Sequence, residues 1–252
     1  MPTAITREVS PTLDRCELEF HSRQPIDVAK AVAQHRHYAE CLRSLGVTVV
    51  SLPAEPDLPD AVFVEDPAVV LDEIAVMTRM GVASRRGEAE SLAGVLERYR
   101  PLHWLTDPAT LEGGDVMRVG RRIFVGASRR SNARGIAQFA EIVQPFGYRV
   151  EVVEVRGCLH LKSACTYLGR NSVLVNRAWT DPAPLEGLDL VDVDAGEPGA
   201  ANALPIGDTV LFPTSFPATA AKLERLGWKL LPIDISELMK AEAALTCSSL
   251  IF

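Results

Sequence analysis

The sequence predicts an α/β fold in which five ββαβ-like units surround a central space. Pairs of short, β-rich apolar runs recur along the 252 residues, and most pairs are followed by a segment whose apolar residues have helical spacing. The polar residues at which the units open recur every 42 to 48 residues, within the range of repeat architectures. Equivalent positions of units around one axis point toward each other, so we expect five side chains to converge: Glu65, Glu112, His160, Asn202 and Cys247.

Four units begin with a strand pair joined by a polar or glycine-containing turn. These pairs lie at 62–79, 111–129, 159–177 and 200–215, and residues 245–252 open a fifth unit that the N-terminus would complete. The individual β-rich runs are 47–52, 61–64, 74–78, 123–127, 149–155, 172–176 and 209–213.

Helical spacing predicts four helices bounded by residues typical of helix ends. The first begins after Asp27, whose side chain can cap free amides, and stops at Gly46. The four segments are 28–45, 88–99, a stretch after Ser131 that ends by Gly147, and 218–227 after Pro217. The stretch 176–200, rich in Pro, Asp and Gly, shows no helical pattern.

Composition points to an ordinary globular protein, with 47% apolar, 23% charged and 6% aromatic residues. No apolar run approaches the roughly 18 residues of a membrane span, and no signal-like stretch is seen near Met1, so we expect a cytoplasmic location. Five cysteines without a disulfide-framework spacing are expected to be reduced thiols. The net charge of −7 argues against a nucleic-acid partner and is compatible with a cationic small ligand.

Cys247 and His160 are the candidate nucleophile and proton carrier. A cysteine in an apolar run usually packs in a core, but Cys247 lies between a threonine and a serine and occupies the unit position of His160. His160 alternates with two leucines, so on a strand with core leucines it would face the central space; a hydrogen-bonded core histidine is the alternative. Imidazole titrates near neutral pH, which suits a group that first donates and then accepts a proton.

Carboxylates gather at two turn-like stretches. "FVEDP" holds Glu65 and Asp66, with Asp60 upstream, and "LEGGD" holds Glu112 and Asp115. Beside Gly and Pro such residues often stabilise turns. Gathered in one pocket, the carboxylates would repel each other unless a cation lay between them. A guanidinium meets this need because its planar donors pair with carboxylates in bidentate fashion.

Two basic pairs follow β-rich runs, Arg85 with Arg86 in "ASRRGE" and Arg129 with Arg130 in "ASRRSN". Such pairs are most often solvated charge. In a pocket that binds a cation, one arginine from each loop would instead hold a carboxylate at the other end of the ligand. An amino acid with a guanidino side chain presents both groups.

Several other classes of site lack their motifs. The sequence contains no G-x-G-x-x-G, G-x-x-x-x-G-K-[ST], H-E-x-x-H or G-x-S-x-G, so dinucleotide, phosphate-loop, zincin and serine-hydrolase sites are not expected. Cys158 and Cys165 flank His160 without a C-x-x-C spacing or a second ligand pair, so we expect no structural zinc.

Together the motifs resemble those of the dimethylarginine dimethylaminohydrolases. The matching stretches are "LPDAVFVEDPAVV", "SRRGE", "TLEGGDVM", "FVGASRRSNARG", "LHLK", "AANA" and "LTCSSLIF", in order along nearly the whole chain. This family belongs to the guanidino-modifying superfamily. The resemblance therefore implies its fold, a single five-bladed α/β-propeller (pentein) domain over residues 1–252 with the active site at the centre.

The resemblance also implies roles for individual residues. Cys247 matches the nucleophile, His160 the general acid and base, and Glu112 the acidic residue that orients the histidine and the guanidinium. Ala241 occupies a position where a larger aliphatic residue is common. The positions that match substrate-binding residues are Leu18 on an N-terminal loop that closes over substrate, Asp60 near the α-amino group, Glu65 and Asp66 near charged groups, Arg85 and Arg130 on the α-carboxylate, and Ala241.

The implied reaction is hydrolysis of asymmetric dimethylarginine or monomethylarginine to citrulline and a methylated amine through a covalent thiouronium on Cys247. No cofactor and no metal are implied. The expected partner is this small-molecule substrate, with no nucleic acid and no membrane, and a homodimer is left open. The alternatives are an arginine deiminase or amidinotransferase on the same fold and, more remotely, a catalytically silent amino-acid-binding protein.

Overall fold

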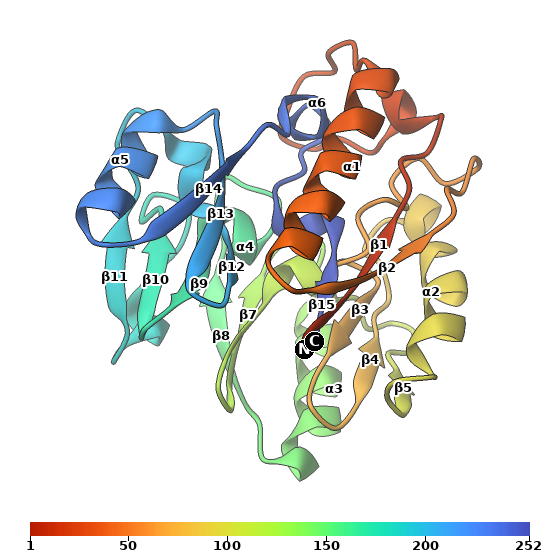
Figure 1. Ribbon diagram of the computed structural model, residues 1–252. Helices are drawn as coiled ribbons and strands as arrows, with labels where there is room; N and C mark the ends of the chain where they lie inside the picture. Colours follow the sequence, from red (N-terminus) through yellow and green to blue (C-terminus); the bar gives the residue numbers. More distant parts are fainter.

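Five three-stranded sheets form the framework of the computed structural model, which describes residues 1–252 (Figure 1). The strands are β1 (Thr3–Arg7), β2 (Thr48–Leu52), β3 (Ala68–Val70), β4 (Ala75–Met77), β5 (Leu102–Trp104), β6 (Val116–Val119), β7 (Arg122–Ala127), β8 (Arg149–Glu154), β9 (Cys165–Gly169), β10 (Ser172–Val175), β11 (Asp189–Asp192), β12 (Leu204–Ile206), β13 (Thr209–Pro213), β14 (Lys229–Ile233) and β15 (Leu250–Ile251). The helices are α1 (Val28–Ser44), α2 (Glu88–Leu96), α3 (Ala133–Val143), α4 (Leu161–Ala164), α5 (Pro217–Arg225) and α6 (Ser236–Met239).

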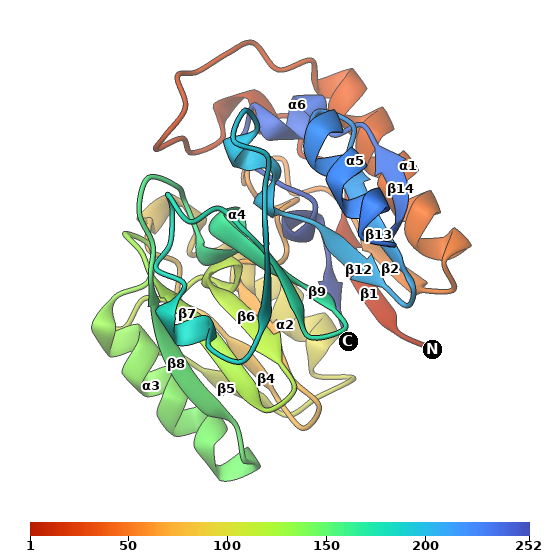
Figure 2. The same ribbon diagram turned by 90° about the vertical axis from the view of Figure 1, so that its left-hand side faces the viewer.

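Each sheet repeats one connection pattern. Two antiparallel strands, joined as a hairpin in four of the five sheets, are followed by a third strand that pairs in parallel with the second, as in β6–β7–β8. In that unit α3 connects β7 to β8 and lies beside them at the periphery (Figure 2). A crossover connection of this kind is what a parallel strand pair requires.

The first and last parts of the chain share one sheet. The central strand β1 pairs antiparallel with β15, where Ala4 faces Ile251, and in parallel with β2, where Thr3 faces Thr48. The two termini accordingly lie close together in Figure 1. The expectation that the N-terminus completes the unit opened by residues 245–252 is confirmed.

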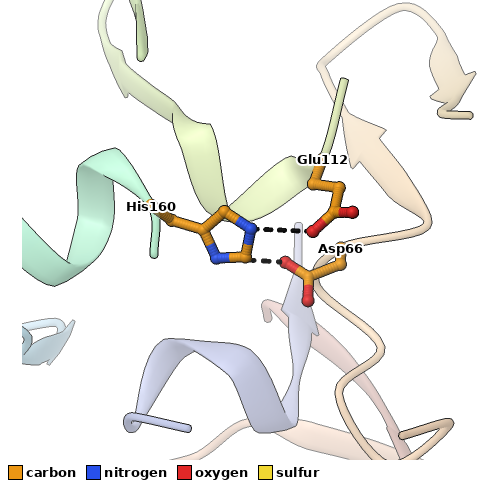
Figure 3. A group of neighbouring side chains, drawn as sticks. All are labelled: Asp66, Glu112 and His160. Atoms are coloured by element: carbon orange, nitrogen blue, oxygen red, sulfur yellow. Dashed lines mark hydrogen bonds and ion pairs between the residues drawn. The ribbon is translucent and has the colours of Figure 1, made fainter. Parts of the chain in front are cut away.

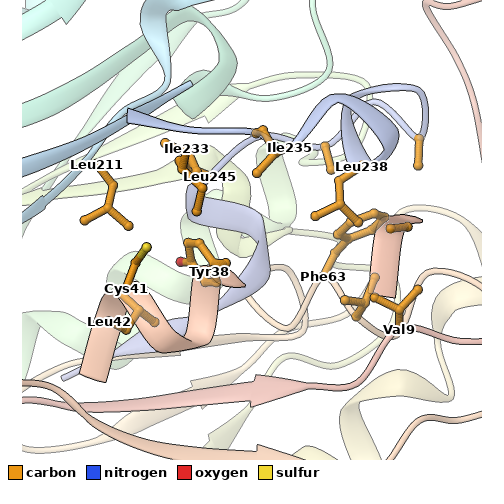
Figure 4. Packing of buried hydrophobic residues seen from close by; sticks show 14 of the residues in the cluster. Val9, Tyr38, Cys41, Leu42, Phe63, Leu211, Ile233, Ile235, Leu238 and Leu245 are labelled. Carbon is orange, nitrogen blue, oxygen red and sulfur yellow. The ribbon is translucent and has the colours of Figure 1, made fainter. Parts of the chain in front are cut away.

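Neighbouring units are joined by buried apolar clusters. The largest packs α1 against β13, β14 and the segment that follows them, with Tyr38 and Leu42 of the helix facing Leu211, Ile233 and Leu245 (Figure 4). Burying such side chains is worth about 1.5–3 kcal/mol each. This cluster fixes the C-terminal segment, which carries Cys247, on the N-terminal helix.

The helix boundaries follow their capping residues. Asp27 accepts a hydrogen bond from the Lys30 amide at 3.0 Å and begins α1, as predicted. Asn132 rather than Ser131 caps α3, accepting from the Gly135 amide at 2.7 Å. The helix predicted at 88–99 ends at Leu96 and continues as turns.

Three strand predictions near the centre were wrong. Residues 61–64 form buried turns rather than a strand, with the Phe63 amide bonded to the Asp60 carbonyl at 2.9 Å. His160 precedes α4 as its cap residue, and Cys247 lies in the 3₁₀ turn Thr246–Ser248 just before β15. The apolar residues at these places satisfy their backbone groups by turns, so apolar runs alone did not distinguish them from strands.

The stretch 176–200 contains one strand that the sequence pattern did not predict, β11, which pairs in parallel with β10. None of the helices has both the length and the apolar character required to cross a membrane.

Candidate active site

A small cavity lies among loops and turns outside the strands. Six segments reach it: the loop after β1, the turns at 60–66, the loop that carries Arg85, the loop that carries Arg130, residues 159–160 before α4, and the segment before β15. Its lining residues are Glu17, Asp60, Phe63, Asp66, Arg85, Arg130, Leu159, His160, Ala241, Glu242, Ala243 and Cys247.

His160 is a buried imidazole that lines this cavity. Its Nε2 bonds to Glu112 Oε2 at 2.8 Å, and its Nδ1 lies 3.9 Å from Asp66 Oδ1 (Figure 3). Burial lowers the pKa of His160, but the charges of Asp66, Glu112 and Asp115 and the bond to Glu112 outweigh it and raise the pKa to about 9. The imidazole is therefore a cation at neutral pH, ready to donate a proton.

Glu112 lies behind His160 rather than in the cavity wall and is completely buried. Besides His160, its carboxylate accepts the Gly81 amide at 2.9 Å and faces Arg130 Nη1 at 3.4 Å. Burial raises the pKa of Glu112, but His160, Arg85 and Arg130 outweigh it and lower the pKa to about 2. Glu112 thus remains an anion that orients the imidazolium.

Asp66 connects the histidine to the arginines. Its Oδ2 accepts from Arg85 Nη1 at 2.9 Å, and its Oδ1 accepts from the Gly114 amide at 3.1 Å. Both oxygens are therefore held in place, while the residue still reaches the cavity. A fixed carboxylate at this position can hold a planar cation in front of His160.

The two arginines differ in the donors that they leave free. Arg85 is fully engaged, because its Nε and Nη2 form a bidentate pair with Glu88 at 2.8 Å each and its Nη1 bonds to Asp66. Arg130 bonds through Nε to Glu19 at 3.1 Å and through Nη1 to Glu112, leaving Nη2 without a protein partner. Arg130 therefore has more free N–H donors, on Nη2, with which to bind an anionic group.

Cys247 reaches the same cavity from the 3₁₀ turn before β15. Its carbonyl accepts the Glu65 amide at 3.2 Å, and its Sγ faces the Ala244 amide at 3.5 Å. Burial raises the pKa of the Cys247 thiol well above its ordinary value, and the nearby Glu65 and Asp66 raise it further. A cation is needed to favour the thiolate.

Glu65 lies below the cavity floor and not in its wall. It accepts from Lys162 Nζ at 2.5 Å and from Thr246 Oγ1 at 2.8 Å, and Thr246 is bonded in turn to Asn202 Nδ2 at 2.9 Å. Residues Glu65, Lys162 and Thr246 also line a second cavity among β3, β6, β9, β12 and β15. The buried network therefore separates the two cavities and supports the turn that carries Cys247.

The remaining predicted positions lie around the entrance. Asp60 accepts the Glu17 amide at 3.1 Å and lines the cavity, as does the small side chain of Ala241. Leu18 is half-buried and packs against the cluster around α1, while its neighbour Glu17 lines the cavity. The loop after β1 thus closes one side of the site.

The five unit-opening residues converge, but as two connected groups. Glu112 meets His160, and Glu65 and Asn202 meet at Thr246, the neighbour of Cys247. Sequence reasoning missed the partners that hold these groups. They are Glu88, Lys162 and Glu242, together with Ser128 and Ser131, which bond to the buried Asp115 at 2.6 Å each. Glu88 in "SRRGE", Lys162 in "LHLK" and both serines in "FVGASRRSNARG" lie within the matching stretches, whereas Glu242 lies in none.

Asp66, Glu112 and His160 also form a group with metal-ligand atoms within 4.8 Å of one another. Their atoms are already committed to Arg85, Gly81 and each other. His160 is held as a cation, whereas a metal requires a neutral imidazole. The donor set therefore favours proton transfer over metal binding.

Known proteins resemble this chain in both sequence and structure. The family model described as "N,N dimethylarginine dimethylhydrolase, eukaryotic" matches residues 8–177. The N(G),N(G)-dimethylarginine dimethylaminohydrolase of Pseudomonas aeruginosa is 34% identical over 228 residues, which is 90% of either chain. That of Streptomyces coelicolor is 36% identical over 247 residues, 98% of this chain and 95% of the relative. The P. aeruginosa structure, a cysteine-to-serine mutant with citrulline, has a TM-score of 0.94 at 32% identity and covers 99% of this chain and 98% of its own.

Proposed function

Because the chain belongs to the dimethylarginine dimethylaminohydrolase family, we propose that it hydrolyses asymmetric dimethylarginine and monomethylarginine to citrulline and dimethylamine or methylamine. The observation that carries this proposal is the cavity in which Cys247, Asp66 and a cationic His160 meet. The citrulline bound to the P. aeruginosa relative supports the product, and the S-methyl-L-thiocitrulline adduct of a histidine-to-glycine variant, 32% identical to this chain, supports a guanidino-like ligand.

Binding of the substrate prepares the nucleophile. The thiol of Cys247 has a raised pKa because it is buried near Glu65 and Asp66. A guanidinium placed near these carboxylates offsets their charge and lowers the thiol pKa, so the thiol proton passes to solvent when the substrate arrives. Asp66, which lines the cavity, also fixes the planar cation with its carbon open to attack.

The first chemical step forms a carbon–sulfur bond. The Cys247 thiolate attacks the guanidinium carbon, His160 donates a proton to the methylated nitrogen, and the carbon–nitrogen bond breaks to release the amine. A thiouronium cation remains on Cys247, and His160 is left neutral. Glu112 holds the imidazole in one orientation through both protonation states.

The second step consumes water. Neutral His160 accepts a proton from a water molecule as its oxygen bonds to the thiouronium carbon. The carbon–sulfur bond then breaks, its electron pair returns to Cys247, and loss of the remaining hydroxyl proton gives the ureido group of citrulline. His160 is again a cation, so the cycle can repeat.

The far end of the substrate meets opposite charges. We place the α-carboxylate on the free Nη2 of Arg130, with Arg85 contributing positive charge from its paired position. Asp60 would receive the α-amino group, Leu18 would cover it from the loop, and Ala241 would contact the chain through backbone. Glu65 would act through Lys162 and Thr246 rather than by contact.

The same proposal extends to the whole molecule. We propose that the five sheets close into a five-bladed propeller as one domain over residues 1–252, supported by the sheet that joins β1 to β15. Five free cysteines support a reducing, cytoplasmic location. A homodimer stays a prediction, which light scattering of the purified protein would test.

Turnover assays test the function directly. Wild type should release citrulline and dimethylamine from asymmetric dimethylarginine, and Cys247→Ser should release neither. Cys41→Ser, a control cysteine on α1 outside the site, should keep full activity. Turnover of plain arginine alone would move the chain to the deiminase side of the superfamily. Activity retained in Cys247→Ser would exclude the proposed nucleophile.

A further inference from the structure

Glu242 has a backbone conformation that few residues of its kind adopt. Its φ is +57°, in the left-handed region, whereas the other two non-glycine residues with positive φ, Arg170 and Asn171, form the turn between β9 and β10. Such a backbone is unfavourable for a glutamate unless its surroundings hold it. Glu242 takes the left-handed position that ends the turn after α6, where its amide bonds to the Met239 carbonyl at 3.1 Å and the Ala243 amide bonds to the Leu238 carbonyl at 3.3 Å. Glycine is the usual residue at such a position, whereas here a glutamate side chain reaches the wall of the cavity.

The side chain of Glu242 holds the loop after β1. Its carboxylate accepts three successive backbone amides, from Glu19 at 3.0 and 3.1 Å, from Phe20 at 2.6 Å and from His21 at 2.5 Å. Hydrogen bonds to an ionised acceptor are about twice as strong as neutral ones. No strand or helix lies between Cys16 and Asp27, so these bonds replace regular secondary structure in fixing this loop.

The loop held in this way contacts the groups expected to bind the substrate's amino-acid end. The Glu17 amide donates to Asp60 Oδ2 at 3.1 Å, and Glu19 Oε2 accepts from Arg130 Nε at 3.1 Å. A shift of the loop would move both contacts, so Asp60 would lose its backbone donor and the fork of Arg130 would be released.

We propose that Glu242 is a positioning residue for the reaction: its carboxylate fixes residues 19–21 so that the loop presents Asp60 and Arg130 to the substrate's amino and carboxylate groups. This proposal rests on the proposed function, because it assigns the loop to a methylated arginine. Glu242 touches neither the sulfur nor the imidazole in the hydrogen-bond network of the site, so its loss affects binding more than chemistry.

Two substitutions distinguish the effect of the Glu242 carboxylate from that of its left-handed backbone. Glu242→Gln keeps the length but loses the charge, and Glu242→Gly removes the side chain while relieving the left-handed backbone. Both should raise KM for asymmetric dimethylarginine about tenfold or more, with kcat within about twofold of wild type. Glu197→Gln is the matched control, because Glu197 also accepts two successive amides, from Ala218 and Thr219 at 2.8 Å each, away from the cavity.

Hydrogen–deuterium exchange gives a readout that needs no turnover. The amides of residues 19–21 should exchange about tenfold faster in both Glu242 variants than in wild type. In Glu197→Gln their exchange rates should equal those of wild type. An unchanged KM in both variants overturns the positioning role. Unchanged exchange rates of residues 19–21 would show that Glu242 does not hold the loop. If wild type turns over no guanidino substrate, the proposed function fails, while the exchange comparison still decides whether Glu242 holds the loop.

Discussion

The hydrogen bond between His160 and Glu112 shifts two pKa values in opposite directions. His160 is raised from 6.5 to about 9, so the stability it contributes is fully present below about 6.5 and is lost as the pH rises through about 9. Glu112 is lowered from 4.5 to about 2, so its contribution is present above about 4.5 and is lost as the pH falls through about 2. At neutral pH the pair is therefore an ion pair inside the protein.

Glu112→Gln should lower the pKa of His160 from about 9, because burial then acts with one opposing charge fewer. We expect kcat near pH 7.5 to fall about 100-fold or more, since the imidazole loses its orienting partner and part of the negative charge that keeps it protonated. A pH–rate profile and an NMR titration of His160 measure the two effects. Glu73→Gln, which removes an exposed partner of Arg121, should change neither. A His160 titration that stays near pH 9 would refute the assignment of the shift.

The residues proposed to perform chemistry were easier to single out in the sequence than the residues that support them. Cys247, His160 and Glu112 open repeated units, and their spacing was visible without coordinates. Glu88 lies in a charged stretch and Glu242 between alanines, and for either a solvated side chain is the ordinary expectation. The contact of Glu88 with Arg85 is local, three residues apart, whereas only the folded chain brings Glu242 to the loop after β1.

At the scale of elements, the 3₁₀ turn Gly113–Asp115 shows why the site requires a double glycine. A Cβ on Gly113 would lie 2.0 Å from the Glu65 carbonyl oxygen, and one on Gly114 would lie 2.5 Å from His160 Nδ1 and 2.8 Å from Asp66 Oδ1. Neither glycine has a positive φ. Their role is therefore to allow close approach of backbone and side chains rather than an unusual conformation.

Gly114→Ala should abolish most activity by pushing the imidazole and Asp66 apart. The control is Gly94→Ala in α2, where a Cβ meets nothing within 4 Å and should stabilise the helix by about 0.5–1 kcal/mol. Citrulline release and urea unfolding measure both variants. A fully active Gly114→Ala enzyme would show that His160 does not require its present position.

Elements with a regular apolar pattern were predicted well, and those without one were not. α1 and α3 have caps and helical spacing, whereas β11 is a four-residue edge strand with aspartates at both ends. Such a strand exists because β10 offers a free edge after the crossover, and no local pattern reports this. The apolar turns at 61–64 show the converse error, since burial near the site requires apolar residues in any conformation.

At the scale of the whole molecule, the last strand links three parts of the chain. Leu250 packs with Met77 of β4 and Leu92 of α2. The Phe252 ring stacks edge-on against Tyr99 with centroids 5.2 Å apart. The Thr3 and Phe252 backbones bond to each other at 2.7 and 2.9 Å. The segment that closes the first sheet thus also holds the neighbouring unit, three residues after Cys247.

Removal of residues 250–252 therefore tests whether the five sheets form one cooperative domain. Loss of one buried leucine and two backbone hydrogen bonds should cost about 3–5 kcal/mol, which corresponds to a Tm lowered by roughly 10 °C in a single transition. The shortened chain should lose enzymatic activity at temperatures where it is still folded, because the turn that carries Cys247 is no longer tied to β1. Leu226→Ala, at a residue 55% exposed on the surface, is the control and should leave Tm unchanged. Calorimetry that resolved two transitions, only one of them shifted, would show that the sheets unfold as separate domains and that the chain ends do not complete a single ring.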